Sequence, residues 1–85
     1  MDVYTTDVYE GCYYLLGGCA LEAIEVTGLA GRTVCRMRFQ GEDLGRLQVE
    51  YQHGRAQVDL FSFRRAYRQL SRTLTEARRA KRERV

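Results

Sequence analysis

The sequence predicts a single α+β domain, and three observations lead to this fold class. The chain has 85 residues, which is near the lower end of what folds unaided around one core. A strand-like alternation of apolar and polar residues occupies its middle, over Thr33 to Gln40. Segments with helical periodicity stand on both sides of it, so helices and a hairpin are expected to share that core.

A short helix is predicted over residues 6–17. The Thr-Thr-Asp sequence that ends at Asp7 offers side-chain oxygens to the unpaired amides of a first turn, and Asp7 with Glu10 fits a capping box. The apolar residues that follow recur at helical spacing. Gly17-Gly18 then ends the helix, because glycine adopts the left-handed cap conformation at little cost.

Two strands joined by a glycine-containing loop are predicted next. Leu21 to Thr27 alternates imperfectly, and a bulge near Ala23 would tidy the pattern. Gly28 to Arg32 has the length of a hairpin loop. In the second strand, Thr33 to Gln40, the odd-numbered residues lie on one face and the even-numbered residues on the other. We expect one face to pack in the core and the other to be exposed to solvent.

The segment from Glu42 to Gln52 fits a helix or a strand. We favour a helix, since its acidic start and the His53-Gly54 that follows it obey helix-end chemistry. Arg55 to Val58 is interpreted as a short third strand or an extended link. Asp59 then caps a long final helix that reaches Val85.

The final helix carries an apolar stripe with a seven-residue repeat. Its two lines are Leu60, Tyr67, Leu74 and Lys81, and Phe63, Leu70, Ala77 and Arg84. A helix of this length spans about 39 Å, whereas a body of the remaining residues would be roughly 27 Å across. We therefore expect a compact domain over residues 1–77 and a basic extension of the helix over residues 78–85.

The same stripe predicts self-association. The stripe could pack against a partner helix as readily as against the hairpin. A chain this short also gains stability from burying more apolar surface. A homo-oligomer is therefore expected, through Phe63, Tyr67, Leu70 and Leu74.

The net charge of +3 conceals two halves of opposite sign. Residues 1–59 hold five Arg and nine Asp or Glu, a net of −4, and residues 60–85 hold nine Arg or Lys and two Glu, a net of +7. The guanidinium group of arginine can donate two parallel hydrogen bonds to the oxygens of a phosphate. Contacts to nucleic acid or an acidic protein are predicted at Arg64, Arg65, Arg68, Arg72, Arg78, Arg79, Lys81, Arg82, Arg84, Arg36 and Arg38. The alternative is a basic face that meets only solvent or this protein's own acidic body.

Candidate sites of other kinds are few. The three cysteines, Cys12, Cys19 and Cys35, have neither paired spacing nor a neighbouring base, and His53 is the only histidine. Six tyrosines stack on bases, line an interface, or form core edges with their hydroxyls in water: Tyr4, Tyr9, Tyr13, Tyr14, Tyr51 and Tyr67. We expect a cytoplasmic protein with no catalytic site, metal, cofactor or membrane span.

A pattern near the end of the chain resembles a known family. Tyr51, Gly54 and Val58 form a Tyr-x-x-Gly-x-x-x-Val segment before the final helix. This resembles a family of small uncharacterised bacterial and phage-associated domains. The resemblance implies an αββαβα-like order of elements and an origin in a phage or mobile element, and it transfers no activity.

Two functions follow from these observations, and both are non-enzymatic. The first is an accessory protein that binds nucleic acid through the basic helix. The alternative is a protein-binding inhibitor or adaptor, carried by a phage or mobile element, that acts on a host protein.

Overall fold

The fold is α+β, as the sequence predicts, and it is built from three helices and a three-stranded antiparallel sheet. The computed structural model describes residues 1–29 and 31–83. The elements follow the order β1 (Asp2–Thr5), α1 (Val8–Leu16), β2 (Ala20–Leu29), β3 (Arg32–Gln40), α2 (Leu44–Gln52) and α3 (Leu60–Glu83). This order, βαββαα, differs from the αββαβα-like order that the family resemblance implies.

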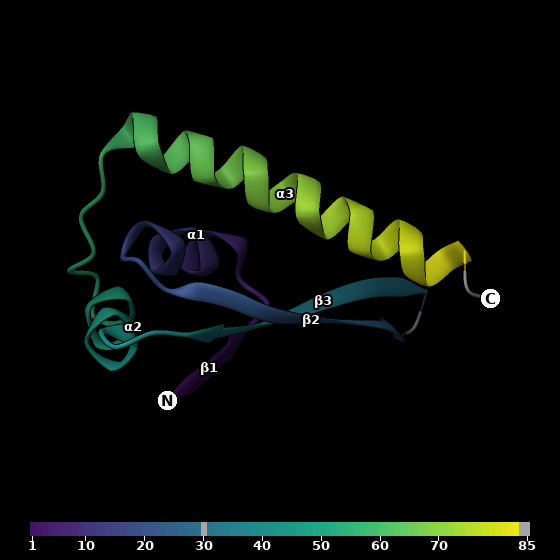
Figure 1. Ribbon diagram of the computed structural model, residues 1–85, viewed down its shortest axis with the longest axis horizontal. Helices are drawn as coiled ribbons and strands as arrows, with labels where there is room; N and C mark the ends of the chain where they lie inside the picture. Colours follow the sequence, from purple (N-terminus) through teal and green to yellow (C-terminus); the bar gives the residue numbers. More distant parts are fainter. Residues whose placement is uncertain (30, 84–85) are drawn as a thin grey trace.

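The sheet and α3 form the two outer layers, with α1 between them at one end (Figure 1). The strand order is β1-β3-β2, so β3 is central and pairs with both neighbours. Helix α2 lies at the end of the molecule occupied by α1, and α3 runs from there to the tip of the β2–β3 hairpin. The core fills the space between the sheet and the helices.

The third strand lies at the amino terminus and not at Arg55–Val58, which is an extended link without strand pairing. Strand β1 has four residues, and Val3 is its only buried one. So short a segment carries no readable alternation. Its conformation comes from pairing with the free edge of β3, where Val3 lies opposite Phe39.

The predicted bulge in β2 is confirmed. Leu21 pairs with Phe39 and Ala23 pairs with Arg38, so Glu22 is the extra residue. The shift brings Leu21 to the face that also holds Ile24 and Val26, which are packed against the core. The hairpin loop is shorter than predicted, because Leu29 already pairs with Arg32.

Helix α1 begins as predicted, but its cap is only half of a capping box. Asp7 accepts hydrogen bonds from the amides of Tyr9 and Glu10. The Glu10 carboxylate does not return to the amide of Asp7, which donates instead to Thr5 Oγ1. Glu10 accepts from the hydroxyls of Thr5 and Tyr14. Gly18, with φ +87°, supplies the left-handed conformation after the helix.

Two tyrosines join α1 to α2. Tyr13 of α1 donates to Glu50 Oε2 at 2.6 Å, and Tyr51 of α2 donates to Asp7 Oδ2 at 2.7 Å. Burial, together with the hydrogen bond to Asp7, raises the pKa of Tyr51 to about 12. The predicted picture of core-edge tyrosines with hydroxyls in water is therefore wrong for this pair and for Tyr14, which is fully buried.

Helix α2 has the predicted carboxyl end, and helix α3 has the predicted amino end. Residues 44–52 are helical rather than extended; His53 is the carboxyl cap and Gly54 has φ +70°. Asp59 caps α3 through a hydrogen bond from the Ser62 amide at 2.9 Å. That bond and the Ser62 hydroxyl lower the pKa of the Asp59 carboxyl.

Helix α3 does not leave the sheet at Ala77. Both Ala77 and Arg78 are half-buried, and a cavity between α3 and β2 is lined by Ile24, Val26, Ala77, Ala80 and Lys81. The predicted overhang assumed a spherical body, whereas the molecule measures 40 × 27 × 21 Å. The β2–β3 hairpin reaches the carboxyl end of α3 (Figure 1). Arg84 and Val85 lie outside the described residues.

At Gly11, side chains of β3 and α3 approach the backbone of α1 closely. A Cβ at this position would stand 3.1 Å from Leu70 Cδ2, 3.1 Å from Phe39 Cζ and 3.4 Å from Met37 Sδ. These three side chains are buried and have little room to move. A glycine in the middle of a helix costs about 1 kcal/mol relative to alanine, and here it permits the contact of three elements.

We expect Gly11→Ala to lower the free energy of unfolding by about 1 kcal/mol, because overpacking costs of about 1–3 kcal/mol exceed the helix-propensity gain of about 1 kcal/mol. Gly45→Ala is the matched control, since its Cβ would meet only the exposed Met1 side chain. It should be neutral or stabilising. Urea unfolding monitored by circular dichroism compares the two, and equal stabilisation by both variants would contradict the packing.

Stability should also depend on the protonation of Glu50. Hydrogen bonds from Tyr13 and Arg46 lower the pKa of its carboxyl, so its stabilising contribution is present above the unfolded pKa and is lost as the pH falls through the folded pKa. We expect Glu50→Gln to flatten the loss of stability between about pH 5.5 and about pH 3. Urea midpoints measured across that range test this; parallel curves for the two proteins would refute it.

Candidate functional site

The outward face of α3 carries a straight column of basic side chains. At about 100° per residue, Arg65, Arg68, Arg72 and Arg79 fall within an arc of about 60°. All four are exposed. We call these four residues the arginine column. The arc lies opposite the buried Ala66, Leu70 and Leu74, so packing of the apolar stripe turns the column away from the body.

The column is free of neutralising contacts over most of its length. Within residues 1–29 and 31–81, Arg65, Arg68 and Arg72 form no ion pair, and neither does the flanking Arg64. The ion pairs that do form involve Arg36 with Glu25, and Arg46 with Asp43 and Glu50. The acidic half of the chain therefore does not cover these arginines, which answers the alternative that the body neutralises its own helix.

Three aromatic rings stack beside the column at its amino-terminal half. The Tyr9 ring lies 6.0 Å from that of Phe63 and 5.6 Å from that of Tyr67, with interplanar angles of 26° and 21°. Tyr9 is 57% exposed and Tyr67 is 40% exposed. With Leu60, Arg64 and Arg68 they line a shallow cavity of about 330 Å³. Rings and guanidinium groups thus share one surface, drawn from α1 and α3.

Two exposed apolar residues at the start of α3 were not predicted as site residues. Leu60 is 70% exposed and Phe61 is 77% exposed. Phe61 borders Arg64, Arg65 and Arg68 at the edge of the column. The helical spacing could have predicted the exposure of Phe61. It lies two residues from Phe63 and so falls on the opposite side of the helix from the apolar stripe.

The residues predicted for self-association divide into two groups. Leu70 and Leu74 are 2% exposed, because they pack into the core of their own chain. Phe63 is half-buried, and Tyr67 remains partly exposed within the aromatic stack. The heptad line is therefore largely occupied by the body, and only its outer members stay accessible to a partner.

The hairpin arginines do not share a face with the column. Cys35, Met37 and Phe39 of β3 point into the core beneath the helices, so the alternating Arg36 and Arg38 point to the opposite face of the sheet. Arg36 lies over the Tyr4 ring at 4.2 Å and pairs with Glu25 at 3.4 Å. The predicted contact set is thus split between two sides of the molecule.

The last predicted basic residues lie differently from the column. Arg78 is half-buried and lines a cavity between α3 and β3, and Lys81 lies on the sheet side of the helix. Arg82 belongs to α3, but its side chain lies outside the described part of the structure, as does the whole of Arg84.

Thiols and metal-ligating groups form no cluster in the described residues. Cys12, Cys19 and Cys35 are free and buried, and burial raises the pKa of the first two thiols. No group of three or more His, Cys, Asp or Glu side chains within the described ranges could hold a metal ion. Across the same residues, no helix has the length and apolar character needed to cross a membrane.

Comparison of the chain with models of protein families, with curated proteins and with solved structures gives no match. The site is therefore interpreted from its own residues.

Substituting alanine for a large side chain should affect stability differently on the two sides of α3. We expect Leu70→Ala to lower the free energy of unfolding by about 2–5 kcal/mol, because it leaves a cavity in the core. Phe61→Ala, on the exposed side, should change it by less than about 0.5 kcal/mol. Urea unfolding measures both, and a large loss for Phe61→Ala at a concentration-dependent midpoint would indicate that this face is buried in an oligomer.

Proposed function

We propose that this protein binds nucleic acid through the outward face of α3, as a non-enzymatic accessory protein. The observation that carries the proposal is the arginine column, whose members are exposed and, at Arg65, Arg68 and Arg72, have no carboxylate partner among the side chains that the structure describes. Repeated like charges along one helix face cost a few tenths of a kcal/mol per pair. A polyanion removes that repulsion and releases its own counterions on binding.

The dimensions of the column support a nucleic-acid backbone as the ligand. From Arg65 to Arg79 the helix rises by about 21 Å, and duplex DNA carries one charge per about 1.7 Å of its axis. Helix α3 is an outer layer, and no other described helix or strand lies on its outward side (Figure 1). A single helix fits the major groove, which is about 12 Å wide.

The aromatic stack offers nucleic acid a second kind of contact, with its bases. Bases stack on exposed tyrosine and phenylalanine rings, and arginine planes contribute beside them. Tyr9 and Tyr67 offer such rings next to Arg64 and Arg68. A strand with unpaired bases would therefore gain contacts that a closed duplex does not.

A second candidate function is supported by the exposed apolar side chains. Leu60 and Phe61 lie beside arginines and tyrosines, and aromatic residues and arginine are the types enriched at protein interfaces. This favours an inhibitor or adaptor, of the phage- or mobile-element-borne kind, that docks on an acidic host protein. A homo-oligomer would use the same surface.

Salt dependence tests the proposed function. Four phosphate contacts predict a slope of about −3.6 for log K against log salt, and hence a loss of about 150-fold in affinity between 50 and 200 mM salt. Fluorescence anisotropy with labelled single-stranded DNA, duplex DNA and RNA measures the slope. Binding that is absent for all three, or insensitive to salt, would overturn the proposal.

A charge-matched pair of variants locates the contact. Arg68→Gln with Arg72→Gln should weaken binding at least tenfold and reduce the slope by about 2. The control removes the same charge elsewhere, with Arg36→Gln and Arg55→Gln, which lie on the opposite sheet face and in the link before α3. It should leave the slope unchanged. Equal losses in both variants would show that net charge alone drives binding and would contradict the column.

A further inference from the structure

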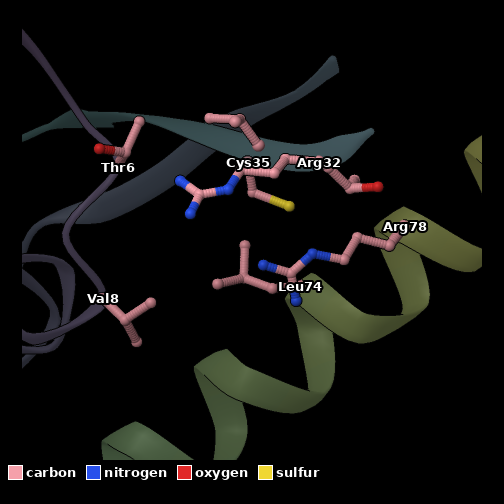
Figure 2. A pocket seen from close by; sticks show the side chains of 8 residues that line it. Thr6, Val8, Arg32, Cys35, Leu74 and Arg78 are labelled. Carbon is pink, nitrogen blue, oxygen red and sulfur yellow. The ribbon is translucent and has the colours of Figure 1, made fainter. Parts of the chain in front are cut away.

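A second basic site lies on the inner side of α3, away from the arginine column. A cavity of about 330 Å³ opens between the first residues of β3 and the carboxyl-terminal half of α3. Arg32 enters it from the strand and Arg78 from the helix, and Figure 2 shows both guanidinium groups pointing into this space with the Cys35 thiol near them. Residues 46 positions apart in sequence thus direct two positive charges into one cavity.

The described lining of this cavity contains no aspartate or glutamate. Its remaining residues are the apolar Val8, Val34 and Leu74 together with Cys35 and two hydroxyl residues, Thr6 and Thr33. Within residues 1–29 and 31–81, neither Arg32 nor Arg78 forms an ion pair. Of the three apolar lining residues, Leu74 is buried and Val8 and Val34 are half-buried. Two like charges therefore enter the cavity without a carboxylate in its described lining, and the partly apolar surroundings strengthen their electrostatic interactions.

The donors in the cavity fit a tetrahedral oxyanion. Each guanidinium group presents a rigid fork of N–H donors, which binds two oxygens of one phosphate in parallel. Two forks from opposite walls would contact different pairs of oxygens, and a threonine hydroxyl can donate to a further one. A carboxylate has only two oxygens and cannot occupy both forks in this way.

We infer that the cavity between β3 and α3 is a phosphate-binding site, formed by Arg32 and Arg78. Its ligand is a phosphate dianion, either free or as a terminal phosphomonoester. The site tethers the hairpin tip to α3 when it is filled, because the two arginines belong to these two elements. It does not depend on the proposed nucleic-acid contact, since the arginine column lies on the other side of the helix.

Amide chemical shifts measured during titration with inorganic phosphate, at constant ionic strength set by chloride, test the inference. Saturable shifts are expected at Arg32 to Cys35 and around Arg78, and not at Arg64 to Arg72. Arg32→Gln and Arg78→Gln should each weaken phosphate binding at least tenfold, since a hydrogen bond to a charged group is lost. Arg55→Gln, which removes an exposed arginine from the link before α3 and outside both proposed sites, is the matched control and should bind phosphate within about twofold of wild type.

Two further arms identify the form of the ligand and guard against misfolding. A trinucleotide with a 5′-phosphate, compared with the same trinucleotide without it, distinguishes a terminal phosphomonoester from free phosphate: tighter binding of the phosphorylated form at the same amides supports the former. Arg78→Lys retains the charge but not the fork, and a folded Arg78→Lys protein with weakened binding supports bidentate recognition.

Three results would overturn the inference. The first is the absence of saturable shifts with both inorganic phosphate and the phosphorylated trinucleotide. The second is an equal loss of affinity in Arg55→Gln and Arg78→Gln. The third is a phosphate response that maps to the arginine column. Binding of duplex DNA by the arginine column is measured separately, so either proposal can fail while the other is still tested.

Discussion

The arrangement of the whole molecule depends on the close approach of three elements at Gly11. Phe39 and Met37 of β3 and Leu70 of α3 all reach within 3.4 Å of the space a side chain would occupy there. With that space empty, α1 fits between the sheet and α3, and Leu70 and Leu74 reach the core. The rotation of α3 about its own axis is fixed by these contacts. The side chains on its outer face are set by that rotation.

A second constraint joins α1 to α2 at the same end of the molecule. Tyr13 and Tyr51 bind carboxylates across the α1–α2 interface, and the rings lie 6.1 Å apart. Each bond satisfies a hydroxyl that would otherwise be partly buried without a partner, which would cost about 1–3 kcal/mol. The same Asp7 that receives the Tyr51 hydroxyl also caps α1. Helix capping and helix packing are therefore coupled at one residue.

The surface chemistry is a consequence of these two constraints. Packing of Ala66, Leu70 and Leu74 turns the arginine column outward and removes most of the heptad line from any partner. It also brings Tyr9 of α1 beside Phe63 and Tyr67 of α3, a contact between two helices that no sequence spacing predicts. The twisted hairpin, running beneath α3 to its end, then brings Arg32 to Arg78. Basic residues of one helix thus serve two separate faces.

Local chemistry determined what the sequence could predict. Capping residues, glycine punctuation and apolar periodicity act within a few residues, so they fixed three helices, the β2 bulge and the buried face of β3. Tertiary structure decided the rest, because those features depend on residues distant in the chain. Strand β1 forms only against the free edge of β3. The sheet extends beneath Ala77 because the β2–β3 hairpin is long and the molecule is elongated rather than spherical. Which arginines converge, and which face solvent alone, was set by packing around Gly11, where three separate segments meet.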